Sequence, residues 1–420
     1  MKLIARRLKS RWATLALFFA IIGPGIITAN VDNDAGGITT YSLAGGNFGY
    51  RLLWIMLPVT VALIIIQEMC ARMGAITGKG LSDLIRERFG LRVTVWVMLG
   101  MLVSNLTNTL AEFAGIASAS EIFGLTRYVA VPVAAITVYL IVVKGTYQKV
   151  EKVFLGACTF YLAYIISGFM ARPDWVEAGH QIIHPAITLD GPSIMMTIGI
   201  VGTTIAPWMQ FYQQASVVDK GIREKDYKFT IIDVVVGCLV AVITCFFIVF
   251  TCAATIHAAG QRVDTIDAAA QALFPLAGRF CATLFAFGLL NASLFAASIL
   301  PLTTTYLVCE GMGWERGVNR NFREAPEFYS LYAGMIVLGA GIVLLPRAPL
   351  LSIMYLSQVL NGVLLPAVLI FILILVNDAR LMGKHRNNRF YNVVSVGVIV
   401  ILIGLTGVLA LTTIWPGLLG

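Results

Sequence analysis

Two short stretches, Asn30-Val-Asp-Asn-Asp-Ala-Gly-Gly37 and Gly202-Thr-Thr-Ile-Ala-Pro-Trp208, each interrupt a long hydrophobic segment of the 420-residue chain. The first stretch places a carboxylate, Asp34, in apolar sequence, where a charge is costly and normally faces a cavity, a partner or an ion. Gly36 and Gly37 beside it can end a helix and bring backbone carbonyls to the same place. Two interrupted helices in corresponding places of two halves indicate the midplane site of a transporter. We therefore expect the chain to carry a cation across a membrane.

The composition is that of a membrane protein. The chain is 58% hydrophobic and 12% charged, and its mean hydropathy is +0.85, far from the balance of a soluble domain. Of the 30 lysines and arginines, 24 fall in six stretches, residues 2–11, 72–92, 144–152, 220–228, 316–323 and 380–389. This alternation follows the positive-inside rule and predicts a cytoplasmic N-terminus. A nucleic-acid partner is a poorer explanation of the net charge of +8.

Apolar stretches long enough to cross a bilayer predict eleven transmembrane helices in an all-α protein. The predicted spans are residues 12–45, 52–74, 93–122, 128–144, 153–172, 192–218, 229–256, 270–309, 328–346, 349–377 and 391–413. Eleven crossings from a cytoplasmic start place the C-terminus outside, in a multi-pass protein of the cell membrane. The N-terminal stretch lacks a small-residue cleavage site followed by a soluble domain, so we interpret it as the first span and not as a signal peptide.

Residues 1–420 are expected to form a single transmembrane domain, because every polar connection is shorter than a folded domain. The longest connections are residues 172–191, 257–268 and 310–327. The interrupted spans are the first and the sixth, which fits a repeat of five spans. The repeats would cover about 12–172 and 192–377, with the second copy inverted, and 391–413 would be an accessory helix.

The chemistry is expected at the interruptions. An unwound segment frees carbonyl oxygens, which are good ligands for a hard cation, and Asp34 would offset the dehydration of the ion. The alternative for Asp34 is a salt bridge to another helix, but no Lys or Arg lies near the middle of a predicted span. Asp32 could equally be a ligand or a carboxylate in an aqueous vestibule.

The seven cysteines lie in or at the ends of apolar spans and do not form a disulfide framework. Cys238, Cys245 and Cys252 recur every seven residues, which places them on one helix face. Such a stripe could bind a soft metal, but small packing residues in a helix bundle are the favoured interpretation.

Several motifs, in order along some 330 residues, resemble the NRAMP family of divalent-metal transporters. They are Gly23-Pro24-Gly25, Asp34-Ala-Gly-Gly37, Thr77-Gly-Lys-Gly-Leu-Ser-Asp-Leu84, Ala111-Glu112-Phe-Ala-Gly115, the segment from Gly202 to Gln213, and Ser357-Gln358. The resemblance implies the family's fold, a LeuT-like 5+5 inverted repeat with broken helices 1 and 6.

Two departures from the family pattern concern the metal. Ala206 stands where the family has a metal-binding Met, and Gly37 stands where it has an Asn. A thioether favours soft transition metals over Mg²⁺, so its loss removes that selection and enlarges the site. Mg²⁺ usually keeps several waters and needs only one or two carboxylates. The pattern resembles the divergent NRAMP-related magnesium transporters, and drift within an ordinary manganese transporter is the alternative.

Further departures concern protons. The two sixth-helix histidines of the family correspond to Trp208 and Gln213, and a third-helix Asp corresponds to Thr109. Span 328–346 lacks the arginines of its counterpart, and the four histidines of the chain fall in connections. Because proton relays through membranes need Asp, Glu or His, and only Glu112 remains of that set, we expect transport without proton coupling.

The expected metal-site residues are Asp34, Gly37, Thr203, Ala206, Gln358 and Glu112. Carbonyls near Gly37 and Thr203 would join Asp34. Glu112 could hold a water of the ion or act as a nearby charge, and it could equally be a buried protonated carboxyl. Gln358 could bind the ion directly or through water, or could bridge helices as membrane amides do.

We expect a transporter of Mg²⁺ and Mn²⁺ that works by alternating access in the lipid bilayer. The transported ion is the only expected bound group, with no cofactor, nucleic acid or obligatory protein partner. The alternatives are a proton-coupled Mn²⁺/Fe²⁺ transporter of the same family and a Na⁺-coupled amino-acid symporter of the same fold. An enzyme is not expected, because the sequence has no His/Cys metal cluster, nucleophile elbow or Gly-rich phosphate loop.

Overall fold

The structure is a computed structural model that describes residues 31, 33–144, 158–185, 190–318, 320 and 322–414. Regular structure in these residues is entirely helical. The α-helices are α3 (Ala35–Phe48), α4 (Met56–Thr77), α5 (Leu81–Phe89), α6 (Leu91–Ile122), α7 (Arg127–Val143), α9 (Leu162–Met170), α10 (Trp175–Ile183), α11 (Gly191–Thr204), α12 (Pro207–Asp219), α13 (Tyr227–Cys252), α14 (Ile266–Ala270), α15 (Phe274–Ala277), α16 (Cys281–Met312), α17 (Pro326–Val343), α18 (Leu350–Asn377), α19 (Ala379–Met382) and α20 (Arg389–Ile414).

The helices have the lengths that a bilayer requires. About 20 apolar residues cross the hydrocarbon core, and a helix satisfies its backbone polar groups internally. Within the described ranges, eight helical stretches are long and apolar enough to cross a membrane, and α7, with 17 residues, is a shorter apolar helix. Each predicted span contains a described helix, although residues 12–30 and 153–157 lie outside the described part. The number eleven stays a prediction, as do the repeat boundaries.

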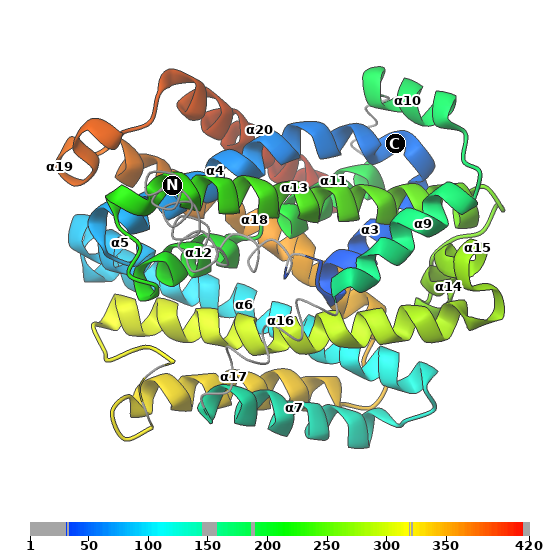
Figure 1. The fold of residues 1–420 in the computed structure, drawn as a ribbon, viewed down its shortest axis with the longest axis horizontal. Coiled ribbons are helices and arrows are strands. Elements are labelled where there is room, and N and C mark those ends of the chain that lie inside the picture. Colours follow the sequence, from blue (N-terminus) through cyan, green and yellow to red (C-terminus); the bar gives the residue numbers. More distant parts are fainter. Residues whose placement is uncertain are drawn as a thin grey trace, which may run out of the picture.

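Long helices run side by side along the horizontal axis of Figure 1. α6 packs against α16, α17 and α18, while α20 packs against α18 and α11 at the edge. α5 and α19 lie at one end of the bundle, and α10, α14 and α15 lie at the opposite end (Figure 1). The predicted connections around α5 and α10 therefore lie at opposite ends, as a membrane topology with these loops on opposite sides requires.

The outside of the bundle is apolar. Trp96, Val337 and Val393 are 76%, 68% and 70% exposed, and many other large apolar side chains are exposed with them. A surface of this size would aggregate in water and suits hydrocarbon. The chain is a multi-pass membrane protein.

The first interruption lies at Asn33 and Asp34, just before α3 begins at Ala35. The prediction that Gly36 and Gly37 are unwound is wrong, because both lie in the first turn of α3. Asp34 caps this helix by accepting the Gly37 N–H, which draws the glycines into the helix. Asp32 and the Gly23-Pro24-Gly25 motif lie outside the described residues.

The second interruption lies at Ile205 and Ala206, between α11 and α12. Pro207 is the first residue of α12, where its missing N–H and its fixed φ are favourable. Pro207 is also four residues after Thr203, so the Thr203 carbonyl cannot receive the usual helical hydrogen bond. The proline thus both starts α12 and leaves a carbonyl oxygen available at the end of α11.

Candidate metal site at the helix interruptions

Asp34 is buried at the start of α3, with 3% of its surface exposed. Its Oδ1 accepts the N–H of Gly37 at 2.7 Å. Helix N-termini stabilise anionic groups through unpaired N–H groups and the helix dipole. Gly37 therefore contributes to the site through its N–H, which holds the carboxylate of Asp34 in place.

Glu112 of α6 faces the same helix start. Its Oε2 accepts the Ala35 N–H at 3.3 Å, which brings its carboxyl group beside Asp34, the residue before Ala35. Its Oε1 has no hydrogen-bond partner among the described residues. Two buried carboxylates close together repel each other unless they share a proton or bind a cation. The pair is thus a strong attractor for positive charge.

Gln358 of α18 lies beside the first turn of α3. A Cβ on Gly36 would collide with the Gln358 side-chain amide, so the absence of a side chain at Gly36 lets that amide approach the α3 backbone. The Gln358 Oε1 accepts Asn361 Nδ2 at 2.9 Å, and Nε2 contacts Ser357 Oγ at 3.3 Å. The amide nitrogen is therefore the end of Gln358 that faces Gly36.

The orientation of Gln358 depends on a buried chain of amides between α6 and α18. Asn361 and Asn108 exchange two hydrogen bonds of 3.0 Å. Ser104 Oγ donates to Asn361 Oδ1 at 2.7 Å. Since Asn108 precedes Glu112 by one helical turn, this chain links the two sides of the candidate site.

The second interruption meets the same part of α18. A Cβ on Gly202 would collide with the backbone of Gln358 and Gly362, so α11 and α18 are in backbone contact there. Thr203, the next residue, is 2% exposed. Ala206 is 1% exposed, and its carbonyl accepts Gln210 Nε2 at 3.2 Å. Asp34, Gly37 and Glu112 therefore meet at the start of α3. Gln358 reaches this point beside Gly36 and also contacts Gly202, the residue before Thr203. The Ala206 carbonyl instead bonds within α12.

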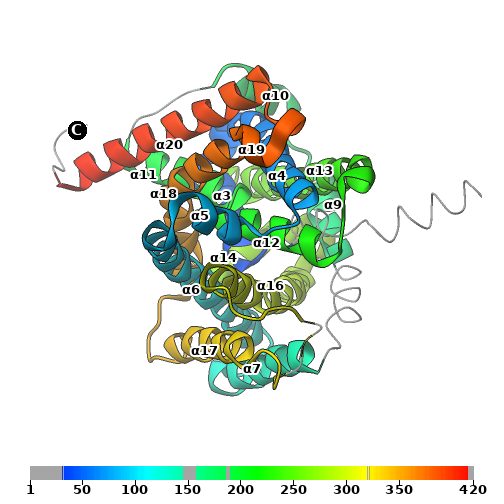
Figure 2. The ribbon, with the colours of Figure 1, turned by 90° about the vertical axis from the view of Figure 1, so that its left-hand side faces the viewer.

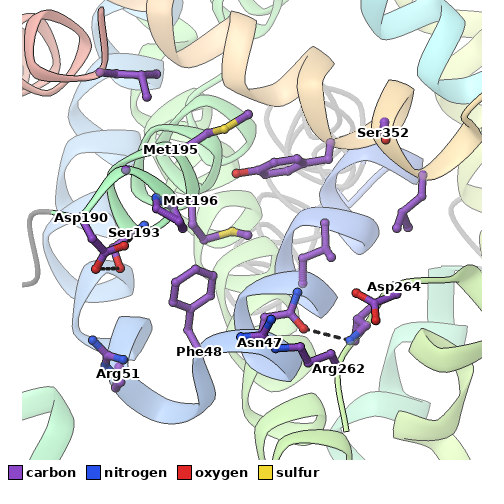
Figure 3. A pocket seen from close by; sticks show the side chains of 17 residues that line it. Asn47, Phe48, Arg51, Asp190, Ser193, Met195, Met196, Arg262, Asp264 and Ser352 are labelled. Carbon is purple, nitrogen blue, oxygen red and sulfur yellow. Dashed lines mark hydrogen bonds between the residues drawn. The ribbon is translucent and has the colours of Figure 1, made fainter. Parts of the chain in front are cut away.

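The opposite end of the molecule from α5 holds a cavity of about 1040 Å³ between α3, α11 and α18. Its charged lining residues are Arg51, Asp190, Arg262 and Asp264 (Figure 3). The lining extends inward to Leu43, nine residues after Asp34 on α3, or about 13 Å along the helix. The cavity thus lies at the end of α3 opposite to the candidate site.

Two contacts lie between this cavity and Asp34. Tyr41 Oη and Thr204 Oγ1, 2.7 Å apart, join α3 to α11. Thr39 Oγ1 donates to Met354 Sδ at 3.5 Å and joins α3 to α18. Because Thr39 and Tyr41 lie between Asp34 and Leu43 on α3, these contacts lie between the carboxylates and the inner end of the cavity.

At the other end, polar contacts hold α12 between α4, α5 and α16 (Figure 2). Gln214 Nε2 donates to the Lys79 carbonyl at 2.8 Å, and Tyr306 Oη donates to Asp219 at 2.5 Å. Arg316 pairs with Asp83 at 2.7 Å. These contacts tie α12, α5 and α16 together on this side of the site.

The residues at the expected proton-relay positions are buried and contain no ionisable group. Thr109 donates to the Asn105 carbonyl at 2.7 Å. Trp208 and Gln213 are both fully buried, with 1% and 0% of their surfaces exposed. α17 contains no arginine, and its one acidic residue, Glu327, lies in its first turn.

The sequence analysis missed the polar neighbours of the site. Ser104 and Asn108 precede Glu112 at four-residue intervals, and Asn361 follows Gln358 by three residues, so the spacing of polar residues on helical faces could have found them. Asn33 was missed as well. Its carbonyl accepts the Tyr161 hydroxyl at 2.5 Å, and its Oδ1 accepts the Cys245 thiol at 3.2 Å.

Metal-binding side chains are sparse. In the described ranges, no group of three or more His, Cys, Asp and Glu residues comes together. Cys238, Cys245 and Cys252 are buried on α13 and form no disulfide bond among the described residues. The candidate site therefore has two carboxylates, amide groups and backbone oxygens.

Known proteins resemble the chain over nearly its whole length. The family described as Natural resistance-associated macrophage protein-like (Nramp) matches residues 25–412. The divalent metal cation transporter MntH of Yersinia pestis is 27% identical over 408 residues, which are 94% of this chain and 95% of that protein. MntH of Erwinia tasmaniensis is 29% identical over 402 residues, which are 93% and 94% of the two chains.

Solved structures share the fold. The Eremococcus coleocola manganese transporter matches with a TM-score of 0.78 and 21% identity, over 94% of this chain and 86% of that chain. Mhp1, a nucleobase-cation-symport-1 family transporter, matches with a TM-score of 0.56 and 14% identity, over 93% of each chain. Two interrupted helices in this fold, with carboxylates buried beside them, define a membrane transporter of the LeuT-like class and not an enzyme. The chain belongs to the Nramp family, as its motifs predicted.

Proposed function

We propose that the chain is a divalent metal cation transporter that carries Mg²⁺ and Mn²⁺ by alternating access, without coupled proton movement. The proximity of Asp34 and Glu112 carries the proposal, because both carboxyl groups accept N–H groups from the first turn of α3, at the start of a broken helix. A bound cation would supply the positive charge that offsets these two buried carboxylates. The names of the relatives, divalent metal cation transporter and manganese transporter, support a divalent cargo.

The donor set favours a hard, partly hydrated ion. Asp34 is the principal ligand, the Thr203 carbonyl and Gln358 supply further oxygens, and Glu112 binds the ion or one of its waters. Oxygen donors suit Mg²⁺ and Mn²⁺ alike, whereas a thioether would select against Mg²⁺. Ala206 provides only a methyl group, so the site accepts both ions.

Protons have few places to bind along this route. Thr109, Trp208 and Gln213 lack the acid–base groups that a relay needs. Glu112 is the remaining candidate for a proton carrier. In the proposed mechanism its carboxylate instead binds the ion or one of the ion's waters. The runner-up function is proton-coupled Mn²⁺ transport, which the names of the relatives favour.

The orientation follows from the basic stretches. The end with α5 and α19 carries Arg86, Arg88, Arg380 and Lys384, and the positive-inside rule makes it cytoplasmic. The N-terminus is then cytoplasmic, the C-terminus is outside, and the cavity beside Leu43 faces the exterior. No obligatory protein partner is required for this cycle.

Uptake into proteoliposomes tests the proposal. Both Mg²⁺ and Mn²⁺ should enter, Mg²⁺ in millimolar excess should inhibit Mn²⁺ uptake, and a lumenal pH dye should record no acidification. Robust Mn²⁺ uptake that Mg²⁺ cannot inhibit, accompanied by proton influx, would establish the runner-up. Na⁺-dependent amino-acid uptake without metal uptake would indicate a symporter of the same fold.

A further inference from the structure

A groove on the lipid-facing surface lies between α6 and α18, toward the end that carries α5 and α19. It encloses a cavity of about 380 Å³, within the size range of small-molecule sites. All nine of its lining residues are apolar or glycine, among them Trp96, Gly100, Ala367 and Phe371. Its chemistry matches a hydrocarbon chain.

Gly100 keeps this groove open. Glycine destabilises a helix interior relative to alanine, so a glycine within α6 needs a structural reason. A Cβ on Gly100 would meet no atom within 4 Å, so no neighbouring helix requires its absence. The absence of a side chain at Gly100 leaves space in the groove that this residue lines.

A second cavity, of about 630 Å³, lies further along α18, beyond the groove. Ile374 and Asp378 line this cavity, and with Ala367 and Phe371 of the groove they recur every three or four residues, on one helical face. The ring of Phe371, which lines the groove, meets edge to face at 5.1 Å the ring of Phe89, the residue after Arg88 of the second cavity.

The second cavity is basic. Arg88 and Arg380 line it, and both are exposed. Asp378 is the carboxylate in its lining and pairs with Arg88 Nε at 3.2 Å. Arg92, also exposed, lies one residue before the groove residue Val93. Two arginines against one carboxylate give the lining of this cavity a positive balance.

We propose that the groove and the basic cavity together bind one anionic phospholipid. An acyl chain lies over Gly100 between α6 and α18, and the phosphate lies between Arg88 and Arg380. Basic groups at the end of an apolar groove are complementary to a lipid with an anionic headgroup. The lipid comes from the leaflet at the α5 end, which the charge pattern predicts to be cytoplasmic. The proposal does not depend on which ion the protein carries.

Native mass spectrometry of the full chain in detergent, with phosphatidylglycerol or phosphatidylcholine added, tests it. The unaltered protein should retain phosphatidylglycerol at least fivefold more than phosphatidylcholine. Gly100→Leu fills the groove and should lower phosphatidylglycerol retention at least fivefold. Gly341→Leu is the control, because Gly341 is exposed on α17 and a Cβ there also meets no atom within 4 Å.

The headgroup is tested by Arg88→Gln combined with Arg380→Gln, which should abolish the preference for phosphatidylglycerol. Arg279→Gln, at an exposed arginine outside both cavities, should leave it intact. Equal retention of both lipids by the unaltered protein would overturn the proposal, as would unchanged retention in Gly100→Leu. Loss of a dimer in Gly100→Leu, without loss of lipid, would assign the groove to a second copy of the chain and overturn it too.

Discussion

Asn361 Nδ2 donates to Gln358 Oε1 at 2.9 Å, and this bond turns the amide nitrogen of Gln358 toward Gly36. A cation needs the oxygen of that amide. The reciprocal pair of Asn361 and Asn108 remains bonded if both amides reverse, and the Ser104 hydroxyl can either donate or accept. We therefore expect the side-chain amides of Gln358, Asn361 and Asn108 to reverse together when an ion arrives. The reversal would present Gln358 Oε1 to the ion.

Removing Asn361, the central residue of this row of hydrogen-bonded amides, should destabilise the protein. Asn361→Leu removes the partner of Gln358 Oε1 and of both amide atoms of buried Asn108, which should cost roughly 1–2 kcal/mol of unfolding free energy. Thermal unfolding in detergent measures the effect. Asn105→Leu is the control, since both side-chain polar atoms of Asn105 already lack partners among the described residues. Equal losses in the two variants would contradict the role given to Asn361.

Two substitutions separate the charge of Asp34 from its role as a helix cap. Asparagine caps helices as well as aspartate does, so Asp34→Asn should keep the stability of α3 and lose Mn²⁺ binding in calorimetry. Asp34→Ala should lose binding and, in addition, about 1 kcal/mol of stability. Unchanged Mn²⁺ affinity in Asp34→Asn would remove Asp34 from the ligand set.

Ala206→Met should shift selectivity toward Mn²⁺, because the thioether binds transition metals better than Mg²⁺. The measurement is inhibition of Mn²⁺ uptake by Mg²⁺, which should need roughly tenfold more Mg²⁺ in the variant. Ala206→Leu adds a similar volume without sulfur. If leucine shifts selectivity as far as methionine does, the cause is the size of the site and not its chemistry.

The orientation can be tested with single cysteines at Glu87, on α5, and Glu177, on α10, both exposed. An impermeant thiol reagent applied to sealed cells should label only Glu177→Cys, and both should react after the membrane is opened. The cysteines whose side chains the structure describes are all buried, so the native protein should give little background. Labelling of Glu87→Cys in sealed cells would reverse the proposed topology.

The sequence predicted the helical class and the two interruptions because each depends on local chemistry: apolar runs for the helices, and Asp34 and Pro207 for the interruptions. The expected interruption at Gly36 lies two residues after the observed one at Asp34. The sequence did not separate the two positions, because both Asp34 and Gly36 can end a helix. The choice between them involves a distant residue, since Glu112 accepts the Ala35 N–H. The sequence also could not show that Asn361 faces Asn108, because partners on different helices are set by packing.

The contact between Gly202 and Gly362 has a mechanical consequence. Where helices interlock through side chains, one can move past the other only in discrete steps of about a turn. At Gly202 and Gly362, α11 and α18 also meet through backbone, and the Ile198 side chain packs against Gly362. We expect any movement of α11 past α18 to require these packed contacts to separate together with the polar contacts of Gln358 and Tyr41.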